Sequence, residues 1–564
     1  MKNKIVIYQM LPRLFGNEMH ENIPNGSMEQ NGVGKFSYVN DAALRSIRRL
    51  GATHVWYTGV IEHATKTDFS AYGIRPDHHG MIKGCAGSPY AIKDYYDVNP
   101  SLARNVAKRN DEFEALLRRT KRLGLRSIID FVPNHVAREY LSDNQPEGVE
   151  ALGEKDNVSL AFDPQNNFYY IPGEALQPQF DHSMQGVPYH EEPAKATGND
   201  QFHARPSKDD WYETVKLNYG VDYAQGRTAF DPVPGTWGKM RDILLFWAAK
   251  GVDGFRCDMA EMVPVEFWAW AIPQVKMAAP EIIFIAEIYQ PHRYVDYIVR
   301  GGFDYLYDKV GLYDTLRGVI CGTTPASQIT QCWQQVDGYG DRMLNFLENH
   351  DEQRIASDMF AVDPMKAIPG MIVCAMISTC PVMLYSGQEL GERGMDLEGY
   401  SGVDGRTTIF DYWSVDTLAR WCDKRKYSLE KLTDSERALR ECYSHLLKLC
   451  NSLEAVAQGE FYDITYANLD NPRYNAARCF SFLRHNDDEV LLIVVNFDGE
   501  AANVGVKIPL HAFEMTGISH RGELMVSCLY NKDGQFPIEL IPDAPIALSI
   551  PAYSARIISL GSIK

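Results

Sequence analysis

Four short apolar runs in this chain end in carboxylate, imidazole, amide or guanidinium side chains. The four segments are Asp130-Phe131-Val132-Pro133-Asn134-His135, Gly254-Phe255-Arg256-Cys257-Asp258, Ile285-Ala286-Glu287 and Glu348-Asn349-His350-Asp351. A polar side chain at the end of a buried strand is costly unless it binds something or pairs with a neighbour. Four such ends in one chain therefore indicate a functional site.

The residue types at these ends suit the cleavage of an acetal between two sugars. In that reaction one carboxylic acid protonates the leaving oxygen, and a second carboxylate attacks or stabilises the oxocarbenium-like centre. Arg256 and Asp258 are two apart on a strand, so both point to one face, and the guanidinium favours an ionised, nucleophilic aspartate. Glu287 follows an apolar run and is expected to hold its proton longer, as an acid does. His135 and His350 can donate to sugar hydroxyls.

Eight predicted strands alternate with amphipathic stretches between residue 4 and about residue 450. The strands are Ile5–Met10, His54–Thr58, Arg126–Phe131, Gly254–Cys257, Ile282–Ile285, Tyr305–Tyr307, Met343–Phe346 and Val382–Tyr385. Helical patterns between them include Asp41–Leu50, Arg109–Leu123, Gly238–Lys250 and Val265–Met277. This alternation indicates parallel βαβ units, and eight of them favour an α/β fold of the (β/α)8 TIM-barrel type. The alternative for the polar strand ends is an ion-pair network that only holds the barrel mouth.

Two further domains are expected beside the barrel. A βα repeat takes roughly 30 residues, yet the stretch between Asp130 and Asp258 is about four times as long. We therefore predict a small inserted domain B at 137–212 after strand 3, with the barrel, domain A, at 1–136 and 213–457. After the helix Ser435–Leu453, short apolar runs predict a C-terminal antiparallel β-sandwich, domain C, at 458–564. Its strands are Cys479–Leu483, Val490–Asn496, Val504–Ile508, Leu524–Leu529, Ala547–Ile550 and Ala555–Leu560.

The composition narrows the classes of partner. Hydrophobic residues make up 45% of the 564 residues and charged residues 23%, which is ordinary globular usage. The net charge of −18 without a basic run argues against nucleic acid, and no apolar run is long enough to span a membrane. The first ten residues are too polar for a signal-peptide core, and the 11 cysteines show no zinc-ligand spacing. We expect free packing thiols and a cytoplasmic location.

The four polar segments resemble the four signature regions of the α-amylase family, glycoside hydrolase family 13. The resemblance extends from Ile7-Tyr8-Gln9-Met10-Leu11-Pro12-Arg13 to Ile550-Pro551-Ala552-Tyr553-Ser554-Ala555-Arg556. It implies a (β/α)8 barrel with an insert after strand three and a C-terminal sandwich. It also implies the roles of nucleophile, general acid/base and transition-state stabiliser for Asp258, Glu287 and Asp351, with Arg256, His135 and His350 as substrate-contacting residues.

Two other segments resemble parts of the same family. Ser88-Pro89-Tyr90-Ala91-Ile92-Lys93-Asp94-Tyr95 is similar to the segment after strand two, in which Tyr90 would form the stacking floor under a sugar. An aromatic face suits the apolar face of a sugar and the cationic transition state; the alternative is a core or rim tyrosine. Val215-Lys216-Leu217-Asn218 resembles a fifth region typical of neopullulanase- and cyclomaltodextrinase-like members.

Three features bear on metals and specificity. Met259 follows the implied nucleophile, and Glu261-Met262 replaces a Lys-His pair of many endo-amylases, which weakens the case for the family's calcium site. Asn134 nevertheless matches a calcium-ligand position, so we expect no required cofactor but leave a structural calcium ion open. Asp77-His78-His79 is interpreted as a solvated loop and not a metal site, since adjacent side chains diverge.

The expected function is that of a retaining α-glycosidase that hydrolyses α-1,4-glucosidic bonds in malto-oligosaccharides or related α-glucans. Its expected intermediate is a covalent glycosyl-aspartate. The alternatives are a transglycosylase, an isomerase or an α-1,6-glucosidase with the same residues, or a non-catalytic sugar-binding homologue. We also expect the insert aromatics Tyr169, Tyr170, Trp211 and Tyr212 to wall the cleft and favour short chains.

Overall fold

Eight parallel strands close into a barrel in the computed structural model, which describes residues 4–19, 21–519, 521–531 and 534–561. The strand order around the barrel is β1-β18-β17-β16-β15-β14-β5-β2. Their bounds are β1 Val6–Met10, β2 His54–Tyr57, β5 Arg126–Phe131, β14 Gly254–Cys257, β15 Ile283–Ala286, β16 Tyr305–Tyr307, β17 Met343–Phe346 and β18 Val382–Tyr385. Each strand begins and ends within one residue of its predicted bounds. The predicted TIM barrel is confirmed.

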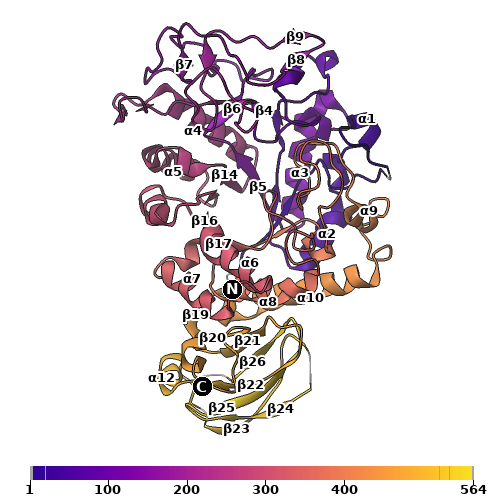
Figure 1. Cartoon of the computed structure of the whole chain (residues 1–564), viewed down its shortest axis with the longest axis vertical. Helices are drawn as coiled ribbons and strands as arrows, with labels where there is room; N and C mark the ends of the chain where they lie inside the picture. The colour runs from indigo at the N-terminus through magenta and orange to yellow at the C-terminus, as the bar shows by residue number, and fades with distance from the viewer. Residues whose placement is uncertain (1–3, 20, 520, 532–533, 562–564) are drawn as a thin grey trace.

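Helices follow the barrel strands along the chain (Figure 1). They are α1 Met28–Asn31, α2 Asp41–Leu50, α3 Arg109–Arg122, α4 Gly235–Ala249, α5 Val265–Ala278, α6 Asp314–Ile320, α7 Ile329–Gln335, α8 Ile368–Met376, α9 Asp416–Cys422, α10 Asp434–Ser452 and α11 Glu454–Ala457. Helix α2 has its predicted bounds because the Asn40 side chain accepts a hydrogen bond from Ala43 N and caps its first turn. Helix α4 begins three residues before its predicted start, since Gly235 and Gly238 weaken the helical signal there.

The barrel lumen is filled by side chains. Ile7, Trp56, Ile128, Ile285 and Leu344 come from five different strands and form one buried cluster. Because side chains alternate along a strand, the residues between them face the surrounding helices. The lumen is therefore a packed core, and polar groups that react must lie above it, at the carboxyl ends of the strands.

Short antiparallel pairs form the region between β5 and β14. They are β6 His135–Ala137 with β11 Thr214–Lys216, β7 Tyr170–Ile171 with β10 Ala194–Lys195, β8 Ser183–Met184 with β9 Val187–Pro188, and β12 Val221–Asp222 with β13 Arg227–Thr228. The β6–β11 pair sets His135 opposite Lys216 at the base of the insert. A further hairpin, β3 Ile61–His63 with β4 Ile92–Val98, follows β2. In Figure 1 the strands β7 to β9 lie at the end of the molecule opposite the C-terminal sheets.

The C-terminal region is antiparallel, as predicted. Its sheets are β19-β20-β21-β26, β22-β25 and β23-β24. Their bounds are β19 Glu460–Asp463, β20 Cys479–His485, β21 Val490–Asn496, β22 Ala502–Lys507, β23 Gly522–Val526, β24 Phe536–Leu540, β25 Pro545–Ile550 and β26 Ser554–Ser559. The sequence prediction missed β19, β24 and the helix α12 Leu510–Thr516. These elements carry few buried residues, so their apolar pattern is weak.

The thiols and the helices bear on two expectations drawn from composition. All 11 cysteines are free thiols, and eight of them are buried. Their role is therefore packing. Within the described ranges, no helix combines the length and apolarity needed to cross a bilayer.

Candidate active site

Arg256 joins the carboxylates at the carboxyl end of the barrel. It is fully buried on β14, and its Nη1 donates to Asp258 Oδ1 at 2.7 Å and lies 3.5 Å from Asp130 Oδ1. Its Nη2 lies 2.8 Å from Glu287 Oε2, and its Nε donates to Tyr307 Oη at 3.1 Å. One guanidinium therefore bridges Asp258 and Glu287, which follow the neighbouring strands β14 and β15.

Glu287 also accepts two hydrogen bonds. The backbone N–H of Met259 donates to Oε2 at 2.7 Å, and Tyr289 Oη donates to Oε1 at 2.5 Å. Met259 has a φ of 44°, a left-handed conformation that a side chain with a Cβ rarely adopts. This turn directly after Asp258 points the N–H at Glu287. Sequence reasoning missed Tyr289, although its position two residues after Glu287 could have indicated a neighbouring side chain.

His350 connects the floor of the site to Asp351. Its Nε2 lies 3.1 Å from Asp351 Oδ2 and forms a hydrogen bond with Tyr90 Oη. The Tyr90 ring also stacks on the imidazole, with 5.3 Å between the ring centroids. Because Gln9 Nε2 donates to Nδ1 at 2.8 Å, the proton of a neutral imidazole sits on Nε2. Burial and the charge of Arg256 hold the pKa of His350 well below its usual value. The imidazole is thus a neutral donor.

A cavity of about 290 Å³ opens above these groups. It is lined by Lys83, Ser88, Tyr90, His135, Trp211, Glu213, Thr214, Asp258, Met259, Glu287, Tyr289, Asp351, Ile409 and Phe410. The structure thus brings the predicted residues Asp258, Glu287, Asp351, Tyr90 and His135 to one cavity wall. The other two, Arg256 and His350, are buried behind that wall and position the groups they contact.

Burial changes the proton affinity of the clustered carboxylates. Desolvation and the charge of Glu287 raise the pKa of Asp258 well above its usual value, against the opposing charge of Arg256. Desolvation also raises the pKa of Asp130 to about 6. Desolvation and Glu287 raise the pKa of Asp351, although cleft water screens this shift because 41% of its side chain is exposed. Arg256 acts as predicted on Asp258, but burial outweighs it. Carboxylates perturbed in this way within a cleft are typical of acid–base sites.

His135 and an ion pair form the wall on the insert side. The imidazole ring lies 5.2 Å from the Trp211 ring. Burial, with the charges of Lys216 and Lys83, lowers the pKa of His135 to about 3, so the ring is neutral. Lys83 Nζ lies 2.9 Å from Glu213 Oε2 across this wall. No pattern in the sequence pairs these two residues, because the contact depends on the tertiary fold.

Asn134 contacts a lysine at the position where the sequence left a calcium ion open. Lys216 Nζ lies 2.6 Å from Asn134 Oδ1 and 2.6 Å from Asp200 Oδ1. The Lys216 side chain is only 2% exposed. Its ammonium already supplies a positive charge to both oxygen ligands and would repel a second cation. The residues present therefore do not fit a calcium ion at Asn134.

We expected four aromatic side chains of the insert to wall the cleft, and this expectation is wrong for three of them. Trp211 lines the cavity, whereas Tyr169, Tyr170 and Tyr212 are buried inside the insert. The insert has no helix of its own among the described residues. Tyr170 joins the main hydrophobic core, Tyr212 joins a smaller cluster, and Tyr169 packs against Phe162, Phe202 and Tyr223. Phe410, from the loop after β18, supplies a further aromatic side chain to the cavity.

The loop at Asp77-His78-His79 also differs from its prediction. Asp77 is buried, and its Oδ1 lies 3.2 Å from Lys93 Nζ, so this part of the loop is not solvated. His78 Nε2 hydrogen-bonds Val187 O, and His79 is exposed. The three side chains diverge, as expected for adjacent residues.

The comparisons with known proteins agree with this geometry. The family model for the α-amylase catalytic domain matches residues 9–294. A maltose-1-phosphate maltosyltransferase of Picrophilus torridus is 22% identical over 284 residues, which are 50% of this chain and 39% of that protein. Alpha-amylase 2 of Dictyoglomus thermophilum is 21% identical over 423 residues, which are 74% of this chain and 60% of that protein. The chain therefore spans less than two thirds of the length of each of these relatives. A maltogenic α-amylase structure from Thermotoga neapolitana shares the fold, with a TM-score of 0.62 at 18% identity over 99% of this chain and 98% of that one. This chain belongs to the α-amylase family.

Proposed function

We propose that the protein is a retaining α-glycosidase that hydrolyses α-1,4-glucosidic bonds in malto-oligosaccharides or related α-glucans. The observation that carries the proposal is the bridge formed by Arg256 between Asp258 and Glu287 at one cavity. Two carboxyl groups held on adjacent nitrogens of one guanidinium are close neighbours. Retaining enzymes need such closeness, because a separation of about 5–5.5 Å lets one carboxylate attack the sugar directly.

In the first step, the Glu287 carboxylic acid gives its proton to the glycosidic oxygen while the bond from C1 to that oxygen breaks. An oxygen of ionised Asp258 forms a new bond to C1 from the opposite side. The products are the leaving sugar with its free hydroxyl and a glycosyl ester on Asp258. Met259 N–H and Tyr289 Oη stay hydrogen-bonded to Glu287 and stabilise the carboxylate left behind.

In the second step, the Glu287 carboxylate takes a proton from water, and the water oxygen attacks C1. The ester bond to Asp258 breaks, and its carboxylate returns to the Arg256 guanidinium. The sugar leaves with the anomeric configuration of the substrate. A sugar hydroxyl in place of water would give transfer instead of hydrolysis, so the identity of the acceptor decides between the two outcomes.

The remaining groups of the cavity suit the binding of one sugar ring. Tyr90 offers an aromatic surface that is fixed by its contact with His350. His135 is a neutral donor, since Asn134 Nδ2 donates to its Nδ1 at 3.1 Å and leaves the proton on Nε2. Asp351 reaches the same cavity and can accept hydrogen bonds from sugar hydroxyls. Together these groups would hold the ring while charge develops at C1.

The cavity wall supports a preference for short chains and for α-1,4 linkages. Met259 lines the cavity without a hydroxyl that could fix one linkage, and Glu261 does not line it. Trp211 and Phe410 present ring surfaces close to the cleavage point. These ring surfaces support the binding of a short chain close to the cleavage point.

A product profile tests the proposal. The protein is incubated with maltotriose, isomaltotriose, pullulan, cyclodextrin, sucrose and soluble starch, and NMR follows the anomer released first. We expect the α-anomer first, maltotriose cleaved faster than isomaltotriose, and a higher kcat/KM on maltotriose than on starch. Release of the β-anomer would contradict the retaining mechanism. Faster cleavage of isomaltotriose or starch would contradict the linkage or chain-length proposal.

A further inference from the structure

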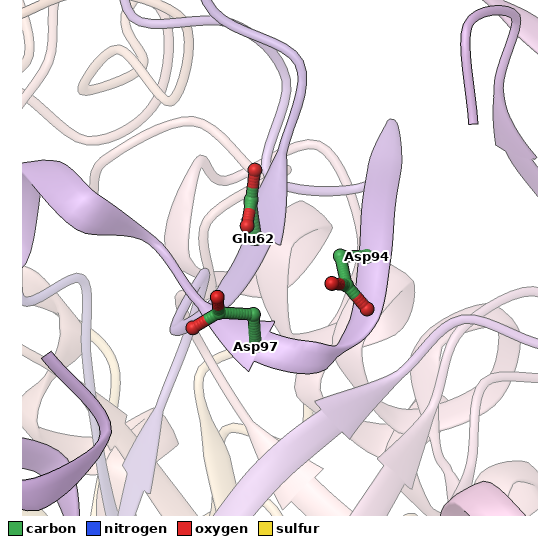
Figure 2. A group of neighbouring side chains, drawn as sticks. All are labelled: Glu62, Asp94 and Asp97. Atoms are coloured by element: carbon green, nitrogen blue, oxygen red, sulfur yellow. The ribbon is translucent and has the colours of Figure 1, made fainter. Parts of the chain in front are cut away.

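Three buried carboxylates meet beside the β3–β4 hairpin, outside the active-site cavity. Glu62 belongs to β3, and Asp94 and Asp97 belong to β4; their exposed fractions are 1%, 0% and 0%. One carboxylate oxygen of each lies within 4.8 Å of the other two. Figure 2 shows the three side chains gathered at this hairpin.

A bulge in β4 brings the three side chains together. Ile61 pairs with Val98, but the next residue, Glu62, pairs with Asp94. One step along β3 thus corresponds to four steps along β4, and residues 95–97 bulge out of the ladder. In a regular strand Asp94 and Asp97 would point to opposite faces. Because bulges re-aim side chains, both aspartates can lie near Glu62.

The cluster holds more negative charge than positive charge. Arg109 Nε donates to both oxygens of Asp97 at 2.9 Å. In the described part of the chain, neither Glu62 nor Asp94 forms an ion pair with a lysine, arginine or histidine. Asp94 instead accepts hydrogen bonds from neutral donors, among them Ser142 Oγ at 2.7 Å. Three buried carboxylates therefore face one guanidinium, which leaves two negative charges without a partner when all are ionised.

Two oxygen atoms at the cluster also lack a hydrogen-bond donor. Glu62 Oε2 is buried and accepts no hydrogen bond. The side chain of Asn110 donates from Nδ2 to Asp97 Oδ1 at 2.9 Å, and its own Oδ1 is likewise buried without a donor. A buried oxygen without a donor costs about 1–3 kcal/mol. A cation that accepts an electron pair from Glu62 Oε2 removes that cost for this oxygen.

We propose that Glu62, Asp94 and Asp97 bind a divalent cation of the calcium type. The two positive charges of the ion balance the two carboxylate charges that Arg109 leaves uncompensated. Calcium prefers carboxylate and amide oxygens as ligands. The three ligand oxygens lie within 4.8 Å of one another, so one ion can contact all three at calcium–oxygen distances of about 2.4 Å.

Such an ion would be structural and would take no part in the cleavage reaction. Tyr90 lies two residues before β4, and Ser142, which binds Asp94, lies at the start of the insert. The ion would therefore hold the β3–β4 hairpin, which lies next to the sugar-stacking Tyr90, against the start of the insert. The site is separate from Asn134, where Lys216 supplies the charge.

Calcium titration of the chelator-treated protein tests the site. Calorimetry at neutral pH should show one calcium ion bound per chain, and Tm should rise with calcium, because a ligand that binds only the folded state stabilises it. Glu62→Gln keeps the shape of the side chain but removes its charge, so the metal-free variant should stay folded. We expect its calcium affinity to fall by at least the roughly 10–100-fold that is seen when metal-site partners are removed.

Asp487→Asn is the matched control. Asp487 is an exposed carboxylate in the turn between β20 and β21, in the C-terminal sheets, and is not one of the three cluster residues. This variant should keep the calcium affinity and the Tm response of the unmodified protein. The proposal is overturned if the unmodified protein binds neither calcium nor magnesium nor manganese and its Tm does not change when these ions are added. Calcium binding of equal affinity in Glu62→Gln would also overturn it.

Discussion

Replacing Arg256 by glutamine removes the positive charge that opposes burial at Asp258. The side chains are joined by a 2.7 Å contact, and both are buried. Unit charges about 4 Å apart interact by about 4 kcal/mol at an effective dielectric constant of 20, and an arginine typically lowers the pKa of a neighbouring aspartate by about 1–3 units. Arg256→Gln should therefore raise the pKa of Asp258 by a similar amount.

The sign of the effect on activity follows from the role of Asp258. The nucleophile must be ionised, so a higher pKa moves the acid limb of kcat/KM to higher pH by about 1–3 units. Activity on the acid side of the optimum should fall roughly 10- to 1000-fold, since each pKa unit corresponds to about 1.4 kcal/mol. The measurement is a kcat/KM profile against pH on a chromogenic maltoside, with circular dichroism to establish that the variant is folded.

Arg256→Lys is the matched control, because it keeps one positive charge but loses the fork that contacts both carboxylates. Its acid limb should move less than that of Arg256→Gln. A folded Arg256→Gln variant whose acid limb coincides with that of the unmodified protein would refute the electrostatic role of this residue.

Three further predictions concern single side chains. Asp258→Asn and Glu287→Gln should each lower kcat by about 10⁴-fold or more in a folded protein, by analogy with removal of other catalytic groups; near-normal turnover in either would contradict the assigned roles. Tyr289→Phe removes a hydrogen bond to the Glu287 carboxylate, worth about 1.5–3 kcal/mol, and should lower kcat/KM roughly 10- to 100-fold; an unchanged rate would show that the hydroxyl has no part in the reaction. Lys216→Met leaves two oxygen ligands without their cation and should lower the free energy of unfolding by about 1–3 kcal/mol, less than a fully buried pair because one partner is 38% exposed; urea unfolding measures it, and an unchanged free energy of unfolding would show that the Lys216 ammonium does not stabilise the fold.

The barrel and the main carboxylates could be predicted because their signals are local. Strand and helix patterns repeat along the chain, and Arg256 and Asp258 are two apart on β14, so their common face follows from strand geometry. Glu287 follows the next strand of the barrel, and adjacency of consecutive strands brings it to the same guanidinium.

The contacts that were missed depend on register and on side-chain packing. Lys216 reaches Asn134 only because β11 pairs with β6, which are far apart in sequence. Asp94 and Asp97 join Glu62 through a bulge that no periodicity indicates. Tyr169 and Tyr170 looked like cleft residues because aromatic side chains serve both as cores and as sugar platforms. Composition alone does not separate those two uses.

The central claim is that Asp258 forms the covalent bond to the sugar, and trapping of the intermediate tests it most directly. A fluorinated α-glucosyl fluoride, which forms the glycosyl ester faster than it is hydrolysed, is mixed with the protein, and peptides are sequenced by mass spectrometry. We predict one glycosyl group per chain, attached to Asp258 and absent from Asp258→Asn. A label on Glu287 or Asp351, or turnover of this donor with inversion and no adduct, would contradict the account.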